Sequence, residues 1–157
     1  MNLDIREARS QDAAALAALC AQVHALHVTW RPELFRAASV EEMKSLFRQW
    51  IGQENFRAYL ALLDGRPVGY VAVRIVDRPG HLLMNPRRFL DVEQIGVAPD
   101  ERGKGIGRAL LEKAREFARE QRLTRIELNV WIENAGARRA FAAWGFRTCS
   151  ERMGLEV

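Results

Sequence analysis

The sequence predicts an α/β domain in which a mixed β-sheet carries helices on both faces. A hairpin signal stands in the middle of the chain, where two β-rich runs meet at Asp64-Gly65, a dipeptide typical of two-residue turns. Later in the chain, strands alternate with amphipathic helices, which indicates an α/β arrangement. Together these two signals favour a mixed sheet.

The N-terminal part of the chain predicts one strand followed by two helices. Alternation over Leu3 to Glu7 suggests the strand. Ser10 is a candidate cap for the first helix, whose apolar residues repeat at helical spacing until Arg31-Pro32 ends it. A second helix is predicted over Val40 to Ile51, where Gly52 provides the C-terminal stop.

The central part of the chain predicts three strands and one surface loop. Phe56 to Leu63 and Pro67 to Val76 form the two arms of the hairpin. Arg78 to Arg88 begins and ends with proline-containing turns, so we expect a loop there. Phe89 to Val97 returns as a strand, and Pro99-Asp100 stops it.

The C-terminal part predicts two more helices and two more strands. Gly103 to Gln121 is strongly amphipathic, and Arg125 to Trp131 alternates as a half-covered strand. Asn134 is a candidate cap for the last helix, which Gly145 would end in a left-handed conformation. Phe146 to Val157 is predicted as the final strand.

The composition is that of one folded domain over residues 1–157, because 48% of the residues are hydrophobic and 28% are charged. Charges interrupt the apolar stretches, so we expect no bilayer span, and the N-terminus lacks the apolar core of a signal peptide. The cysteines, Cys20 and Cys149, are too few for a disulfide framework, and we therefore expect a cytoplasmic protein. The net charge of +4, with interspersed signs, suits an anionic ligand but falls short of a nucleic-acid footprint.

The strongest chemical feature is a glycine-rich junction between a buried strand and an amphipathic helix. Glycines alternate in Arg102-Gly103-Lys104-Gly105-Ile106-Gly107-Arg108. The first turn of a helix leaves backbone N–H groups unpaired and carries partial positive charge, so bare glycines let phosphate oxygens approach them. Arg102, Lys104 and Arg108 add positive charge, and the junction is therefore a good candidate site for a pyrophosphate.

A plain connecting turn and two familiar phosphate-binding motifs fit this junction less well. A tight strand-to-helix turn with packing glycines accounts for the glycines but not for the surrounding cations. A Walker-type loop requires Ser or Thr after Gly-Lys, whereas Gly105 follows Gly103-Lys104. A dinucleotide-binding fingerprint requires different glycine spacing and a position near the first strand.

With these residues in place, the sequence resembles the GNAT superfamily of N-acetyltransferases. That family's signature is Gln or Arg, two residues, Gly, one residue, then Gly or Ala, which Arg102 to Gly107 satisfies. Asp91 to Val97 resembles the family's fourth strand, Ile126 to Trp131 its fifth, and Asn134 to Phe146 its closing helix and strand. The resemblance implies a twisted sheet of six to seven strands that splays apart between the fourth and fifth.

The resemblance also implies a binding site for acetyl-CoA, used as co-substrate without a metal. The junction amides would hold the pyrophosphate, and the fourth strand would offer backbone groups to the pantetheine arm as an added strand does. The last helix would face the cofactor through its cap. The residues implied are Ile95, Gly96, Val97, Arg102, Gly103, Lys104, Gly105, Ile106, Gly107, Arg108, Asn134 and Phe141.

Acetyl transfer requires a base, because a primary amine with a pKa of about 10.4 is almost wholly protonated near neutral pH. By resemblance, Asp91 or Glu93 on the fourth strand is the candidate, and Glu93 is preferred because it lies nearer the splay. Solvent-facing carboxylates at a strand start would look the same. The N–H of Val97 is a candidate oxyanion donor. Phe141 stands where the family often has a tyrosine that returns a proton to the thiolate.

The sequence leaves the acceptor open. Acidic residues on the fourth strand favour a cationic amine, whereas Arg78, Arg87 and Arg88 favour an acceptor that bears a carboxylate. We expect a small-molecule or peptide amine, no membrane partner and, from the family, a homodimer. An acyl-CoA-binding module with little turnover is the alternative that Phe141 motivates, and a nucleic-acid-associated protein ranks below both.

Overall fold

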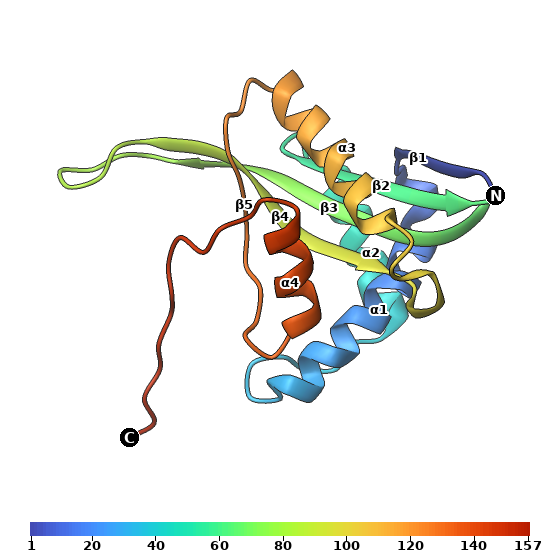
Figure 1. Cartoon of the computed structure of the whole chain (residues 1–157), viewed down its shortest axis with the longest axis horizontal. Coiled ribbons are helices and arrows are strands. Elements are labelled where there is room, and N and C mark those ends of the chain that lie inside the picture. The colour runs from blue at the N-terminus through green and yellow to red at the C-terminus, as the bar shows by residue number, and fades with distance from the viewer.

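A five-stranded mixed sheet forms the centre of the computed structural model, which describes residues 1–157 (Figure 1). The strands follow one another in chain order, and the last pair is parallel while the other pairs are antiparallel. The strands are β1 (Leu3–Glu7), β2 (Phe56–Leu63), β3 (Arg66–Arg78), β4 (Arg87–Val97) and β5 (Ile126–Leu128). The predicted mixed sheet is confirmed, although it has five strands where six to seven were expected.

Helices cover both faces of the sheet, as predicted, and each face has its own apolar core. α1 (Ala13–Trp30) and α2 (Val40–Ile51) cover one face. α3 (Ile106–Glu120) and α4 (Ala135–Ala143) lie on the opposite face. Between the two cores runs β3, whose central residues are almost entirely buried. β3 is thus the rigid support for β4, which carries most of the candidate site.

Local sequence signals account for most of the helix and turn boundaries. Ser39 and Glu42 form a capping box at the start of α2, with their side chains bonded to each other's backbone N–H groups. At the start of α1 the Ser10 cap prediction is wrong: Ser10–Asp12 is a 3-10 turn, and the Asp12 carboxylate accepts the N–H of Arg9. The Asp12 carboxylate also pairs with Arg6, so it is favoured over the Ser10 hydroxyl as the group that holds this turn.

One helical segment, Ser10–Trp30, which is α1 with its preceding turn, is long and apolar enough to cross a membrane. By length and composition, therefore, the expectation that no segment could span a bilayer is wrong. In this fold the helix buries Ala13, Leu16, Ala17 and two further residues against the sheet. Core helices of other folded proteins meet the same criteria.

The predicted loop over Arg78 to Arg88 is confirmed for residues 79–86, whereas its end residues belong to strands. β3 continues to Arg78 and β4 begins at Arg87, and the loop with the outer parts of these two strands forms an arm that projects from the body in Figure 1. The prolines at positions 79 and 86 lie just beyond the last paired residues, where a missing N–H interrupts no ladder hydrogen bond.

The predicted final strand, Phe146 to Val157, is not formed. Phe146 packs on Phe141 and donates its N–H to the Phe141 carbonyl (2.9 Å), and the chain then runs away from the sheet (Figure 1). A strand needs a partner edge, and β5, shorter than the predicted Arg125 to Trp131, offers only Ile126–Leu128. Residues 147–157 are accordingly exposed.

Candidate functional site

The glycine-rich junction adopts the open loop that its sequence predicts. After the 3-10 turn Pro99–Glu101, Gly103 and Gly105 have φ angles of 76° and 81°, which other L-residues adopt only with strain. A side chain at either position would meet no atom of the protein within 4 Å. The two glycines therefore allow the turn of the backbone, and no protein atom fills the space above them. This space is open to a ligand.

The start of α3 presents unpaired donors to this space. The first intrahelical hydrogen bond at this end runs from the Ala109 N–H to the Gly105 carbonyl (3.0 Å). The N–H groups of Ile106, Gly107 and Arg108 precede it and belong to the unpaired first turn, where the helix dipole favours an anion. Gly107 lies close to the ring of Trp144, the residue that follows α4: a Cβ at position 107 would lie 3.0 Å from Trp144 Cη2.

A buried carboxylate fixes the loop and occupies part of its positive charge. Glu101 accepts hydrogen bonds from Lys104 Nζ (2.8 Å) and Arg66 Nη2 (2.6 Å), and its side chain is 8% exposed. These bonds, led by that from Lys104, lower the pKa of Glu101. Arg102 donates its Nε to the Val97 carbonyl (3.1 Å). Lys104 and Arg102 are therefore held by the chain, and Arg108 is the predicted cation at the loop that has no bonded partner.

β4 offers a free backbone edge beyond its short pairing with β5. The two strands pair only over Leu90–Val92, while β4 continues to Val97. Residues of an antiparallel strand direct their backbone groups alternately to either side, and the bond from Ala98 N–H to the Val68 carbonyl (2.8 Å) sets the phase. Ile95 and Val97 therefore point their N–H groups away from β3. The predicted splay between the fourth and fifth strands is present at this edge.

Gly96, also predicted in the cofactor site, is required by the packing of α1. A Cβ at this position would lie 2.8 Å from Val23 Cγ2 and 2.9 Å from Tyr70 Cε1. A side chain would push α1 off the sheet beside the splay. The backbone of Gly96 itself faces β3, because Gly96 is two residues before Ala98 in the same ladder.

A β-bulge brings Asp91 and Glu93 to the same region of β4, as predicted, but leaves them in different environments. The register with β3 slips between Gln94 and Val92, so Glu93 is the extra residue. The Glu93 carboxylate is held in an ion pair by Arg74, which is also bonded to Gln53 and Asn55. The Glu93 carboxylate is therefore already paired within the protein.

Asp91 has no hydrogen-bond or ion-pair partner among the described residues. Its pKa is raised, first by burial and then by the charges of Glu93 and Glu127, against the smaller opposing effects of Arg78 and Arg74. An unpaired carboxylate with a raised pKa, half-covered and beside an open edge, has the properties of a general base.

Tyr70 and Gln94 form a buried polar link under α1. The Tyr70 hydroxyl donates to Gln94 Oε1 (3.0 Å), and Cys20 Sγ donates to the same oxygen (3.4 Å). Burial raises the pKa of Tyr70 well above its ordinary value of 10. The hydroxyl is thus occupied and sealed, which argues against Tyr70 as a replacement for the family tyrosine.

α4 positions Asn134 and Phe141 as the sequence predicts. Asn134 Oδ1 accepts the Ala137 N–H (3.2 Å) and caps the helix, and Gly145 ends it at a φ of 96°. Phe141 is buried against Trp144 and Phe146, so it supplies packing and no proton at its position.

Sequence reasoning missed the arginines that neutralise the site carboxylates. Arg66 lies 35 residues from Glu101, and Arg74 lies 19 residues from Glu93. Neither pair has a local motif. The signal that could have found them is positional: each arginine lies on the strand that the hairpin places beside β4 or its end.

Comparisons with known proteins agree with this geometry. Residues 21–146 match the model of the acetyltransferase (GNAT) family. An uncharacterized N-acetyltransferase of Archaeoglobus fulgidus is 31% identical over 68% of this chain and 70% of its own length. Streptothricin acetyltransferase of Streptomyces lavendulae is 39% identical over 59% of this chain and 46% of its own length. A relative in Methanocaldococcus jannaschii is matched over 38% of its length, so the chain spans less than half of two of these relatives.

Among solved structures, a variant of the BH1408 protein from Bacillus halodurans superposes with a TM-score of 0.92 at 27% identity, covering 98% of this chain and 99% of that one. The overall arrangement therefore has an experimental counterpart of nearly the same length.

Proposed function

The chain belongs to the GNAT acetyltransferase family, and from that premise we propose that it transfers an acetyl group from acetyl-CoA to a primary amine of a small molecule or peptide. The observation that carries the proposal is the pairing of an open first turn of α3 with a free edge of β4. The two features lie at consecutive stretches of chain, Ile95–Val97 and residues 102–108, as one extended ligand with a diphosphate requires.

Each end of the ligand would meet a different kind of group. The N–H groups of Ile106 to Arg108, with the Arg108 guanidinium, would hold the diphosphate. The free N–H groups of Ile95 and Val97 would pair with the amides of the pantetheine arm in the manner of an added strand. Val97 was the predicted oxyanion donor, and Ile95 is the second candidate because it lies closer along β4 to Asp91.

We assign the general base to Asp91 in preference to Glu93. An amine must lose a proton to attack the thioester, and the acceptor of that proton must have a free oxygen. Both oxygens of Asp91 are free, whereas Arg74 holds one oxygen of Glu93 and neutralises the charge of that carboxylate. The raised pKa of Asp91 makes it a stronger base than an ordinary aspartate. Once the proton has moved to Asp91, the neutral amine attacks the thioester carbon and forms the carbon–nitrogen bond. The carbon–sulfur bond then breaks, the thiolate leaves with the electron pair, and the nitrogen loses its second proton to the thiolate or to solvent.

The leaving thiolate would depart without help from α4. A thiol has a pKa of about 8.5, so its anion is a tolerable leaving group without an acid. The buried ring of Phe141 favours this route. It also supports the second candidate function, an acyl-CoA-binding protein with little turnover, since no side chain on α4 replaces the missing hydroxyl.

Two measurements test the proposal together. Titration calorimetry with CoA and acetyl-CoA should show saturable binding, and free-thiol release should rise above background with at least one member of a panel of primary amines. Binding without thiol release from any amine would favour the binding protein. The absence of any heat at millimolar CoA, from folded material, would overturn both functions.

A further inference from the structure

A band of charged side chains lies on the face of β3 and β4 that α2 covers, just beyond the helix. Arg74 lies opposite Asp91, and Arg78 lies opposite Arg87, in one uninterrupted register. Directly opposed residues share a face, and so do residues two apart, so all four side chains project to the same side. β5 adds Glu127 beside Asp91. From the sequence alone, these charges favoured a cationic amine and an acceptor that bears a carboxylate equally.

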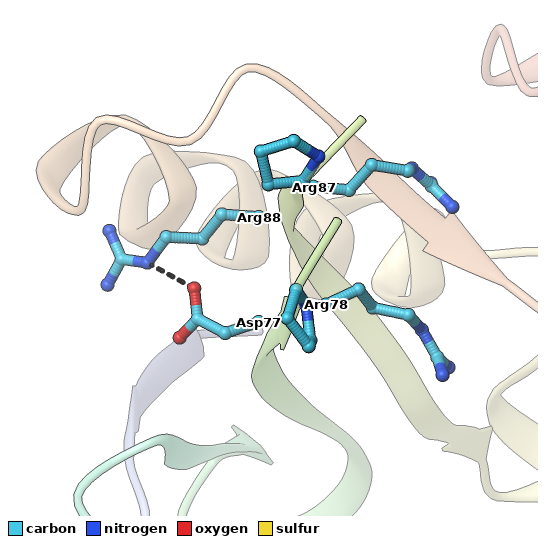
Figure 2. A pocket seen from close by; sticks show the side chains of 6 residues that line it. Asp77, Arg78, Arg87 and Arg88 are labelled. Atoms are coloured by element: carbon cyan, nitrogen blue, oxygen red, sulfur yellow. Dashed lines mark ion pairs between the residues drawn. The ribbon is translucent and has the colours of Figure 1, made fainter. Parts of the chain in front are cut away.

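Most of these charged side chains form ion pairs within the chain and are therefore not free to bind an acceptor. Arg74 is held by Glu93, and Arg87 donates to both oxygens of Glu127 (2.5 and 2.6 Å). On the opposite face of the arm, Arg88 pairs with Asp77 (3.2 Å), as the dashed line in Figure 2 shows. What stays unpaired on the α2 face is one cation, Arg78, and one anion, Asp91.

The position of Arg78 indicates that an anionic partner is missing. It stands directly across from Arg87, and like charges at directly opposed positions destabilise a strand pair unless an anion lies between them. Figure 2 shows the two guanidinium groups extending to the same side of the arm, away from the Asp77–Arg88 pair. Both arginines line an open cavity of about 360 Å³ in the outer part of the arm, whose other lining residues are the prolines at positions 79 and 86 and, from the opposite face, Asp77 and Arg88. Glu127 is shared between Arg87 and Arg125 and does not reach Arg78, so the place for a second anion is at Arg78.

We propose that the acceptor is an amine that also bears a carboxylate, with its amino group at Asp91 and its carboxylate at Arg78. This inference rests on the proposed function and names the acceptor class of that same site. Arg78 would form a bidentate pair with the carboxylate, a geometry that the planar guanidinium favours. Asp91 would first attract the ammonium group and then accept its proton.

The spacing suits an amine carried on a short chain. Arg78 is four residues from Arg74, the register partner of Asp91, which is about 13 Å along the strand at 3.3 Å per residue. The extended Arg78 side chain covers part of that distance. An amino acid with a side-chain amine can bridge the rest, whereas a diamine of the same length leaves Arg78 unpaired.

The test compares matched acceptors that differ only in the carboxylate: lysine against cadaverine, ornithine against putrescine, and 2,4-diaminobutyrate against 1,3-diaminopropane. We expect the wild type to favour the carboxylated member of at least one pair by roughly tenfold or more in kcat/KM. Arg78→Gln should raise KM for that member about tenfold, leave kcat within about twofold, and leave the diamine unchanged. Arg88→Gln, on the opposite face, is the matched control and should change neither.

Equal kcat/KM within every pair, or an equal loss for both members in Arg78→Gln, would overturn the inference while leaving acetyl transfer in place. A second readout is independent of turnover. Calorimetric binding of the amino acids to the protein with CoA present should weaken in Arg78→Gln and persist in Arg88→Gln. If the two variants bind alike, Arg78 is not the carboxylate partner; if CoA itself produces no heat, the proposed function has failed first.

Discussion

Asp91 lies on β4 and Glu101 lies in the 3-10 turn that follows this strand, and their carboxylates have opposite electrostatic surroundings. Glu101 has two cationic partners, Lys104 and Arg66, which lower its pKa. Asp91 has none, and burial with two acidic neighbours raises its pKa. The first arrangement stabilises a loop, whereas the second keeps a carboxylate available for a proton. The difference separates a group that shapes the site from one that can react in it.

The largest expected effect comes from removing the unpaired carboxylate. Asp91→Asn should lower kcat by about 10² to 10⁴, the usual contribution of a general base, with the Kd for CoA unchanged. Glu93→Gln should cost about tenfold or less, because Arg74 holds that carboxylate in the chain. Steady-state thiol release with the best amine measures both. A larger loss in Glu93→Gln than in Asp91→Asn would reverse the assignment and return the base to Glu93.

The next largest effect tests the loop that Glu101 supports. In Gly105→Val, a β-branched residue must adopt the left-handed φ of 81°, which costs roughly 1–2 kcal/mol, and its side chain fills the space above the loop. We expect the Kd for CoA to rise at least tenfold by calorimetry, with kcat at saturation changed much less.

Gly65→Val is the matched control for the loop substitution. Gly65, in the turn between β2 and β3, has a φ of 82° and equally open surroundings, so it carries the same backbone strain outside residues 102–108, one residue before the Arg66 that pairs with Glu101. A similar loss of stability is expected in both variants, and a loss of CoA affinity only in Gly105→Val. Equal affinities would show that the loop does not hold the ligand.

The contrast between the two carboxylates also marks the limit of what the sequence can predict. The glycine loop, the α2 capping box and the Asp64-Gly65 turn are local features, and each forms as predicted because its physical causes lie within a few residues. Lys104 is a local partner of Glu101, but Arg66, its other partner, and Arg74, the partner of Glu93, are distant in sequence. Their positions depend on strand register, including a bulge that no local pattern indicates.

The arm and the C-terminal segment also show that local sequence does not decide where strands form. Residues 79–86 form a loop as predicted, but cross-strand pairing makes β3 two residues longer than predicted at its end and β4 two residues longer at its start. Phe146 to Val157 has strand-like composition, yet the edge strand β5 is only three residues long and Phe146 to Val157 does not pair with it. Which strand propensities are realised depends on partners, and for the candidate site the sequence could name Asp91 and Glu93 but not decide between them.

A smaller effect concerns the stability that the paired carboxylate, Glu101, contributes. Because the pKa of Glu101 is lowered in the folded state, its contribution is present above the ordinary value of 4.5 and is lost as pH falls through the folded value. Glu101→Gln should lower Tm at pH 7 by a few degrees, and the difference from wild type should vanish at strongly acidic pH. Glu112→Gln, which breaks an exposed pair with Arg115, should change Tm by a degree or less.

The smallest expected effect is an increase in Tm, and it comes from the unpaired carboxylate, Asp91. The folded-state pKa of Asp91 is raised above its unfolded value, so the native state binds the proton more tightly and loses stability as pH rises through that range. Asp91→Asn removes the charge and should raise Tm at pH 7 by about 1–3 °C, although it removes most activity. The gain should shrink as the pH falls, because the wild-type carboxyl then becomes protonated as well. Asp77→Asn, which breaks the exposed pair with Arg88, is the control and should give no gain. A fall in Tm for Asp91→Asn would mean that this carboxylate stabilises the fold as Glu101 does, and the distinction between the two carboxylates would then have no basis.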